Sequence, residues 1–270
     1  MTTPRGTIRV GIGGWVFEPW RGAFYPDKWP QKRELEYAAQ RLGSIEINGT
    51  YYGSQKPESF ARWHAETPDH FVFAVKGSRY ITNRRVLAEA GASIERFFAG
   101  GVMELKEKLG PINWQFMPTK QFDPDDFEAF LKLLPNTVNG VTIRHAVEVR
   151  HDSFRTPDFI ALLRHHGVAA IVAADSDYTK IADLTAPFVY ARIMGTTEAQ
   201  PEGYAPAELD HWAQRARTWA EGAMPGDLEP VAPDPPKRQP RDVFLYVISG
   251  DKVRNPAAAM ALTQRLAAKG

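Results

Sequence analysis

The chain has 270 residues, of which 43% are hydrophobic and 24% charged; it has no cysteine, and 33 basic residues against 32 acidic ones give a net charge of +1. This composition is typical of a globular protein with a large core, and it excludes disulfides, thiolate metal sites and cysteine nucleophiles. The near-neutral charge disfavours a protein that coats nucleic acid. The N-terminus lacks a signal-peptide pattern, and the longest apolar run, residues 167–174, is far below the ~20 residues of a membrane span. We therefore expect a soluble, cytoplasmic protein.

Short β-like runs alternate with amphipathic helical stretches. Several runs are almost continuously apolar, which is typical of parallel strands covered on both faces. The predicted strands are residues 7–13, 44–48, 71–76, 112–116, 146–149, 169–173, 188–192 and 243–247. Eight strands that alternate with about eight helices predict a single α/β domain over residues 1–270 with the fold of a TIM-like (β/α)₈ barrel; an open doubly wound sheet is the alternative.

Helix starts and ends are marked by local signals. Asp123-Pro124, Thr156-Pro157 and Asn255-Pro256 each pair a side-chain oxygen suited to the N-cap with a proline suited to the first helical position. Gly167 stands where a glycine is expected after a helix that begins at Pro157.

One segment departs from the alternation. Residues 224–240 contain six prolines, and we predict an irregular excursion over residues 224–241, directly before the last strand. Two interpretations remain open for it, a disordered insertion and a mobile lid.

Polar residues gather at or just after the C-terminal ends of the predicted strands. In a barrel these ends surround the mouth, where active sites lie. The expected catalytic residues are Glu46, Lys76, Glu148, His151 and Asp175, and the expected substrate-binding residues are Asn48, Tyr52, Gln115, Arg150, Arg192 and Trp15. A purely structural interpretation is that the charged members form buried ion pairs within the barrel, because unpaired charges inside apolar strands are costly.

Three kinds of chemistry fit these residues. Glu46, Glu148, His151 and Asp175 are residue types that bind a divalent metal, although no compact ligand motif is present. Alternatively, Lys76 or a carboxylate carries out acid–base chemistry while Arg150 and Arg192 hold a small anionic or polyhydroxylated substrate. In the third interpretation the mouth only binds a ligand. The sequence leaves the reaction, the metal and the oligomeric state open.

The segment after the first predicted strand, residues 15–29, contains six aromatic residues. With Tyr51 and Tyr52 it could form a stacking platform for single-stranded nucleic acid or an oligosaccharide, which is the alternative, non-catalytic function. The simpler interpretation is a hydrophobic cluster beneath a long loop.

Six motifs occur in an order that resembles one protein family. They are GIGGWVFEPWRGAFYP, SIEINGTYYGSQKPESFARW, TPDHFVFAVK, VEVRH, VAADS and FVYARIMG. The chain resembles the family called domain of unknown function 72, the YecE-like proteins. The resemblance implies a TIM-like barrel with a shared polar site at its mouth, and it names no reaction.

The sequence also departs from the family pattern. Asn83 follows Thr82, and Met194 precedes Gly195, where the family often has histidine at both positions. The resemblance therefore gives less support to a metal site here, and it indicates a divergent subgroup.

Overall fold

The computed structural model describes residues 5–173, 175–234 and 236–268. Within them, eight parallel strands close into a barrel in which chain neighbours pair and the first strand pairs with the last. The barrel strands are β1 (Ile8–Gly13), β2 (Ser44–Ile47), β3 (Val72–Lys76), β4 (Leu109–Gln115), β7 (His145–Glu148), β8 (Ala169–Val172), β9 (Phe188–Ile193) and β10 (Asp242–Val247). The predicted TIM-like barrel is thus confirmed, and the open sheet is wrong.

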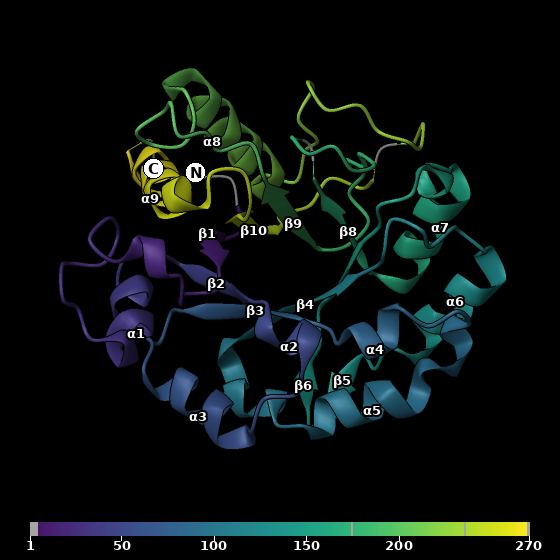
Figure 1. The fold of residues 1–270 in the computed structure, drawn as a ribbon. Coiled ribbons are helices and arrows are strands. Elements are labelled where there is room, and N and C mark those ends of the chain that lie inside the picture. The colour runs from purple at the N-terminus through teal and green to yellow at the C-terminus, as the bar shows by residue number, and fades with distance from the viewer. Residues whose placement is uncertain (1–4, 174, 235, 269–270) are drawn as a thin grey trace.

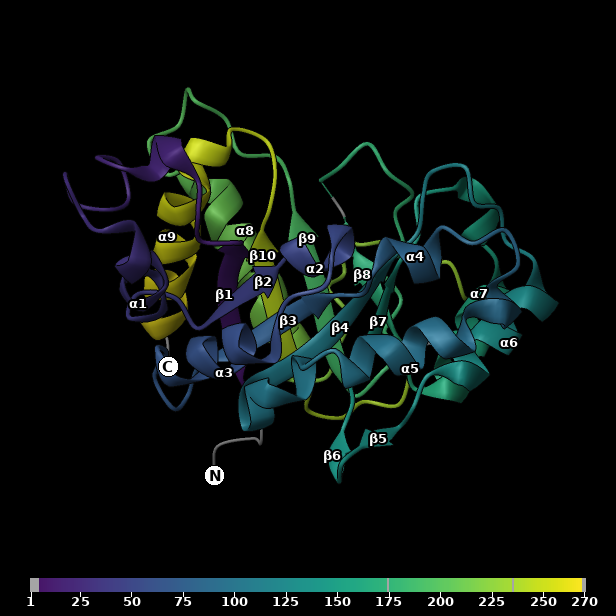
Figure 2. The ribbon, with the colours of Figure 1, turned by 60° about the horizontal axis from the view of Figure 1, so that its bottom comes forward.

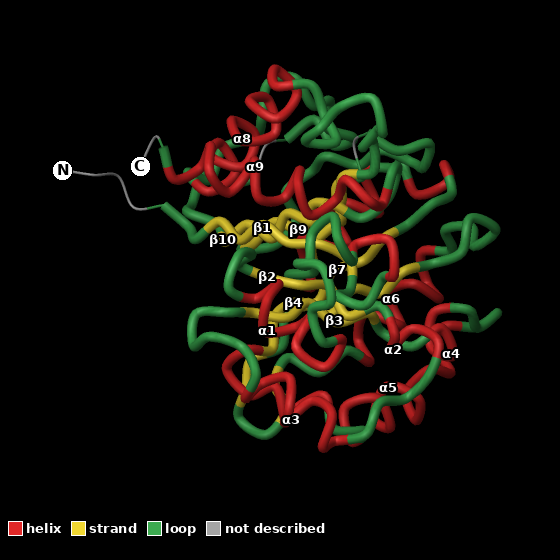
Figure 3. Tube along the Cα trace, turned by 60° about the vertical axis from the view of Figure 1, so that its left-hand side comes forward, coloured by secondary structure: helices red, strands yellow, loops and turns green. Residues whose placement is uncertain are grey.

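Helices surround the strands (Figures 1 and 3). They are α1 (Glu34–Ala39), α2 (Gly49–Tyr52), α3 (Pro57–Ala65), α4 (Arg79–Thr82), α5 (Gly91–Ala99), α6 (Pro124–Leu133), α7 (Pro157–His166), α8 (Pro206–Ala220) and α9 (Asn255–Ala267). Short 3₁₀ turns cover Glu18–Trp20, Gln31–Arg33, Leu87–Ala90, Val102–Lys108, Asp152–Phe154 and Lys252–Arg254. Among the described residues no helix is long and apolar enough to cross a membrane.

The helix signals hold with one exception. Asp123 and Thr156 accept hydrogen bonds from the amides of Asp126 and Phe159, and Gly167 ends α7 with φ at +64°. Asn255 does not cap α9, because a 3₁₀ turn already precedes it and its side chain accepts a hydrogen bond from Thr196 instead.

A two-stranded hairpin, β5 (Thr137–Val138) and β6 (Val141–Thr142), precedes β7 and was not predicted. Its turn is Asn139-Gly140, and both residues have positive φ angles. Asn-Gly is a strong signal for such a hairpin.

The expected alternation fails once, between β8 and β9, where the described residues form no helix. Segment 176–187 and the proline-rich excursion lie beside β8 instead (Figure 1). The carboxylate of Asp183, itself buried, accepts hydrogen bonds from the amides of Val231 and Ala232, so it fixes the excursion to this side of the barrel. The excursion leads into Arg241 at the start of β10, at the end opposite the mouth. The described part of the excursion is therefore held along the side of the barrel by Asp183.

Two separate cores follow from the alternation of strand side chains. One side of each strand packs outward against the helices in the larger core. The other side fills the barrel, where Phe188, Tyr190, Phe244 and Tyr246 form a plug of large rings with small residues such as Ala74 between them. Above this plug, toward the C-terminal strand ends, the interior becomes polar.

Candidate functional site

The polar layer of the barrel is built by strand alternation. Residues two apart on a strand point to the same side, so β2 and β7 direct Glu46 and Glu148 inward, and β3, β4 and β9 direct Lys76, Gln115 and Arg192 toward them. All five side chains are at most 8% exposed. Figure 2 shows β2, β3, β4 and β7 side by side, and β9 follows after β8 in the same parallel barrel.

Arg192 connects the two carboxylates. Its guanidinium lies 3.0 Å from Glu46 Oε1 and 2.5 Å from Glu148 Oε2. Arg150 binds the other oxygen of Glu148 through two donors, at 2.6 and 2.8 Å. Charge-assisted bonds of this kind are the strong ones, and they compensate for the loss of hydration. The structural interpretation of buried ion pairs therefore describes these residues correctly, whatever further role they have.

The pKa values of the two carboxyl groups reflect this pairing. Burial alone would raise the pKa of Glu148, but the charges of Arg192, Arg150 and Lys76 outweigh it and hold the pKa at about 2. Burial opposes ionisation of Glu46 in the same way, yet Arg192 and Lys76 lower its pKa below the usual range. Both groups are anionic at neutral pH and are poor proton donors.

Lys76 differs from the other charged members. Its ammonium donates to Gln115 Oε1 and lies 5.0 Å from the centre of the Tyr51 ring. It forms no salt bridge with any residue in the described part of the chain, because Arg192 and Arg150 occupy the carboxylates. Burial lowers the pKa of Lys76, the charge of Arg192 lowers it further, and the carboxylates only partly oppose them, so the pKa is about 8.

The structure adds two residues that the sequence analysis missed. Tyr190 donates to Glu46 Oε2 at 2.5 Å, and Asn113 donates to the same oxygen at 3.2 Å. Each stands two positions before a residue that was predicted, Arg192 and Gln115. Because residues two apart on a strand point to the same side, the position two residues before Arg192 and the one two residues before Gln115 could have been predicted from the sequence.

Among the described residues, neither His151 nor Asp175 forms a hydrogen bond or ion pair with the charged cluster. His151 Nδ1 lies 2.9 Å from Ser153 Oγ and accepts from the Ser153 amide, which caps the 3₁₀ turn after β7. Asp175 accepts hydrogen bonds from the amides of Met194 and Gly195 and from the Tyr204 hydroxyl. Asp175 thereby ties the segment after β8 to the segment after β9.

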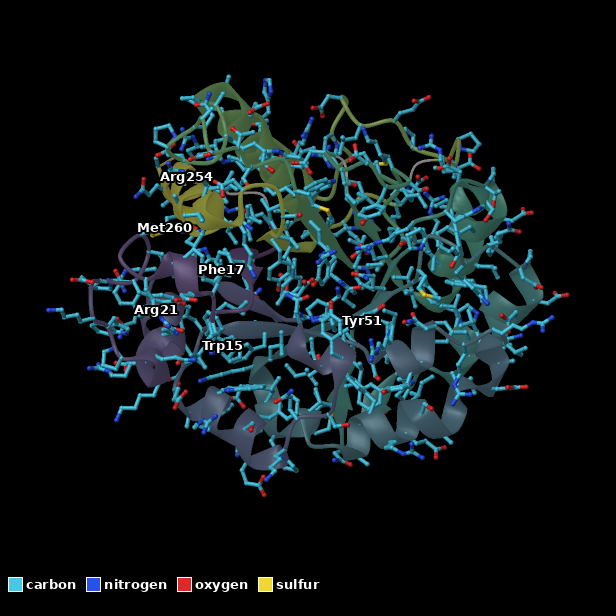
Figure 4. The ribbon with its side chains drawn as sticks, in the orientation of Figure 1. Trp15, Phe17, Arg21, Tyr51, Arg254 and Met260 are labelled. Atoms are coloured by element: carbon cyan, nitrogen blue, oxygen red, sulfur yellow. The ribbon has the colours of Figure 1, made fainter. Side chains whose placement is uncertain are left out.

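Trp15, Asn48 and Tyr52 line a cavity of about 550 Å³ at the mouth, between the ends of β1, β2 and β10. Trp15 packs edge-on against Trp63, with ring centres 5.0 Å apart. Figure 4 labels Trp15 and Phe17, from the segment that follows β1, and Tyr51 of α2. The predicted residues thus fall into two neighbouring groups, the charged cluster and this cavity, while His151 and Asp175 belong to neither.

Three of the six aromatic residues of segment 15–29 are unavailable to a ligand. Trp20, Phe24 and Tyr25 are at most 8% exposed and pack edge-on or tilted against one another and Tyr37. The interpretation as a stacking platform is wrong for these three rings, because they form the hydrophobic cluster beneath the loop.

The metal interpretation meets a physical difficulty. Among the described residues, no three His, Asp or Glu side chains gather in a way that could hold a metal ion. Each carboxylate oxygen of Glu46 and Glu148 already accepts a hydrogen bond from arginine, tyrosine or asparagine. A cation here would compete with Arg192 for the same oxygens.

A closed parallel barrel with a polar layer inside its C-terminal mouth defines the class of this protein as a TIM-like α/β barrel. The chain belongs to the family described as "protein of unknown function DUF72", whose sequence profile matches residues 9–270. The resemblance seen in the sequence is thereby confirmed.

Individual relatives match over part of the chain. The UPF0759 protein YecE of Escherichia coli K12 is 31% identical over 123 residues, which are 44% of this chain and 42% of YecE. The UPF0759 protein YunF of Bacillus subtilis 168 is 24% identical over 157 residues, which are 56% of this chain and 54% of YunF. The chain thus matches about half the length of these curated relatives.

Solved structures show the same fold over nearly the whole chain. A DUF72 family protein from Thermotoga maritima MSB8 superposes with a TM-score of 0.72 at 20% identity, covering 98% of this chain and 100% of that one. A DUF72 family protein from Enterococcus faecalis V583 gives 0.71 at 16% identity, covering 97% and 96%. A xylose isomerase-like TIM barrel/4-hydroxyphenylpyruvate dioxygenase fusion protein gives 0.51 at 13% identity, covering 94% of this chain and 41% of that one.

Proposed function

We propose that this protein is an enzyme in which Lys76 transfers a proton to or from a small anionic substrate bound at the barrel mouth. The observation that carries the proposal is the position of the Lys76 ammonium. It is buried, has Gln115 Oε1 as its one hydrogen-bond acceptor among the described residues, and lies beside two carboxylates that already form ion pairs with Arg150 and Arg192. An ammonium has three donors, so Lys76 retains hydrogen-bonding capacity for a ligand.

The charge of the cluster supports an anionic substrate. Lys76, Arg150 and Arg192 are three cations, and Glu46 and Glu148 are two carboxylates, so the cluster is net positive when Lys76 is protonated. Arg150 is the more accessible of the two arginines, with its side chain 15% exposed. Its Cζ lies 4.0 Å from the centre of the Tyr178 ring, a cation–π contact. A carboxylate or phosphate group of the substrate would pair with the Arg150 guanidinium.

The pKa of Lys76 suits proton transfer near neutral pH. A general base works best when its pKa lies near the working pH, and burial together with Arg192 brings the pKa of Lys76 to about 8. Glu46 and Glu148 would act as positioning residues, because their charges keep this pKa from falling further. We do not assign proton transfer to His151 or Asp175. The proposal retains the expectation that residues 1–270 act as one domain in the cytoplasm.

The test is solvent deuterium incorporation. A mixture of small 2-oxo acids and sugar phosphates would be incubated with the protein in D₂O and followed by proton NMR at pH 6 and pH 8. We expect exchange at a carbon-bound position of at least one compound, faster at pH 8, and absent in Lys76→Met. Lys132→Met, which changes an exposed lysine on α6, is the matched control and should exchange normally. Equal exchange in wild type and Lys76→Met, or none in either, would contradict the proposal.

A further inference from the structure

The mouth cavity beside β1, β2 and β10 has the size and lining of a small-molecule site. Its volume is about 550 Å³, within the range of ligand pockets, which are mostly apolar with a few placed polar groups. Trp15, Trp63 and Ile248 contribute apolar walls, and Asn48 and Gln55 contribute amide groups.

Two large apolar side chains stand exposed at this cavity. Val16 is 52% and Tyr52 64% exposed, and both line it. Exposed apolar groups gathered beside a cavity mark a binding surface more often than isolated ones do. A ligand with an apolar body would cover them.

Lys252 supplies the cavity's charge. Among the described residues that line the cavity, it is the one lysine, and no arginine, histidine or acidic side chain lies with it. Its ammonium lies 4.2 Å from the centre of the Phe17 ring, and it forms no salt bridge with a described residue. Burial lowers its pKa, which reflects a cation held against apolar surface without a carboxylate to balance it.

We propose that this cavity binds an organic anion with a flat apolar body, the body against Trp15 and Tyr52 and the negative group at Lys252. The backbone carbonyl of Lys252 accepts a hydrogen bond from Trp20 Nε1 at 2.8 Å, so the residue that carries the ammonium is anchored to the buried aromatic cluster. Asn48 and Gln55 would bind uncharged polar groups of the same ligand. A site of this composition should bind an anionic ligand more tightly than a neutral one, and an aromatic ligand more tightly than an extended polar one.

The cavity adjoins the charged cluster. The Tyr52 ring, in the cavity wall, is 5.1 Å from that of Tyr51, and Lys76 is 5.0 Å from Tyr51 on the cluster side. Asn48 Nδ2 donates to the backbone carbonyl of Glu46. This inference rests on the proposed function in one respect: the bound ligand would present its reacting group toward Lys76. Binding itself is tested without turnover, so the two proposals fail separately.

The test compares 2-naphthoate with its neutral isostere 2-naphthamide by isothermal titration calorimetry at pH 7 and low salt. We expect naphthoate to bind more tightly than naphthamide. Lys252→Met keeps the aliphatic stem but removes the charge, and it should weaken naphthoate binding at least tenfold, which corresponds to about 1.4 kcal/mol or more. The same variant should leave naphthamide binding unchanged.

Two further variants locate the ligand. Tyr52→Ala should weaken both compounds, whereas Tyr80→Ala, which removes an equally exposed tyrosine (64%) from a different cavity, should weaken neither. The proposal is overturned if naphthoate does not bind at its solubility limit, if the amide binds as tightly as the acid, or if Lys252→Met binds naphthoate as tightly as wild type does.

Discussion

Lys76 and Lys108 are both buried lysines on the β3–β4 pair, at opposite ends of the barrel. Lys76 ends β3 at the mouth, and Lys108 directly precedes β4; they are 7% and 2% exposed. The ammonium of Lys108 donates to the carbonyls of His64 and Thr67, each at 2.7 Å, and to the Thr67 hydroxyl. Lys76 has Gln115 alone among described residues. Lys108 is thus bound by three acceptors of the fold, whereas Lys76 is bound by one, and our proposal gives only Lys76 a role in proton transfer.

The first prediction compares these two lysines. Lys108→Met leaves buried carbonyls without a donor, so it should lower the free energy of unfolding by about 2–4 kcal/mol, since each unsatisfied buried group costs roughly 1–3 kcal/mol. Lys76→Met removes a desolvated cation and should be no less stable than wild type at pH 7. Urea unfolding curves measure both. A larger loss for Lys76→Met than for Lys108→Met would show that Lys76 is a structural residue.

The second prediction concerns Arg192. Arg192→Met leaves Glu46 buried without its arginine and Glu148 with Arg150 alone, so it should cost about 3–5 kcal/mol of stability at pH 7. Arg33→Met, which breaks an exposed pair with Glu36 at 2.8 Å, is the control and should cost less than about 1 kcal/mol. If both variants lose the same small amount, Arg192 does not hold the layer together.

The third prediction concerns how the stability lost in Arg192→Met depends on pH. The pKa of Glu148 is lowered in the folded protein from 4.5 to about 2, so its contribution to stability is complete above pH 4.5 and is lost as the pH falls toward 2. Without Arg192 the pKa values of Glu46 and Glu148 rise in the folded state. Protonation of these groups at low pH therefore costs the variant less stability than it costs the wild type. The difference between wild type and Arg192→Met should therefore be smaller at pH 4 than at pH 7. A constant difference would mean that the loss is one of packing.

The fourth prediction concerns Asp175. Its carboxylate is bound by two backbone amides and the Tyr204 hydroxyl, and burial together with this carboxylate raises the pKa of Tyr204. Asp175→Asn should lower stability by about 1–3 kcal/mol and bring the Tyr204 titration toward its ordinary value, as ultraviolet difference spectra would record. Deuterium exchange at saturating substrate should persist in this variant. Loss of exchange without loss of stability would instead make Asp175 catalytic.

The sequence predicted the barrel because eight β-like, mostly apolar runs alternate with amphipathic helical stretches. It predicted β4 three residues short, at Ile112 rather than Leu109. Gly110-Pro111 is a sequence typical of a strand end, so the sequence predicted a later start for β4. In the structure the strand continues through these residues, with a register irregularity opposite Phe73–Val75 of β3. The missing helix between β8 and β9 could not be anticipated, because the segment that covers β8 in its place comes from residues about 50 positions further along the chain.

The charged cluster was predictable for the same reason as the strands. Glu46, Lys76, Glu148 and Arg192 end their strands on the inner face, and alternation alone brings them together. Strand alternation cannot show which carboxylate pairs with which arginine. In the structure Arg150 and Arg192 pair with Glu148 and Glu46, so no carboxylate forms a salt bridge with Lys76 among the described residues. His151 and Asp175 come after the strands end, where the backbone turns and periodicity no longer fixes direction.

The most direct test is the pKa of Lys76 itself. Selective isotope labelling of lysine side chains, with the Lys76 signals assigned by their absence from the Lys76→Met spectrum, would give its titration between pH 6 and 10 by NMR. We expect a midpoint near pH 8, and a lower one in Glu148→Gln, where a neighbouring negative charge is lost. Because the pKa is lowered on folding, wild-type stability should also rise from pH 7 to 9.5, a rise that Lys76→Met should lack. A Lys76 midpoint near the ordinary 10.5 would contradict the account.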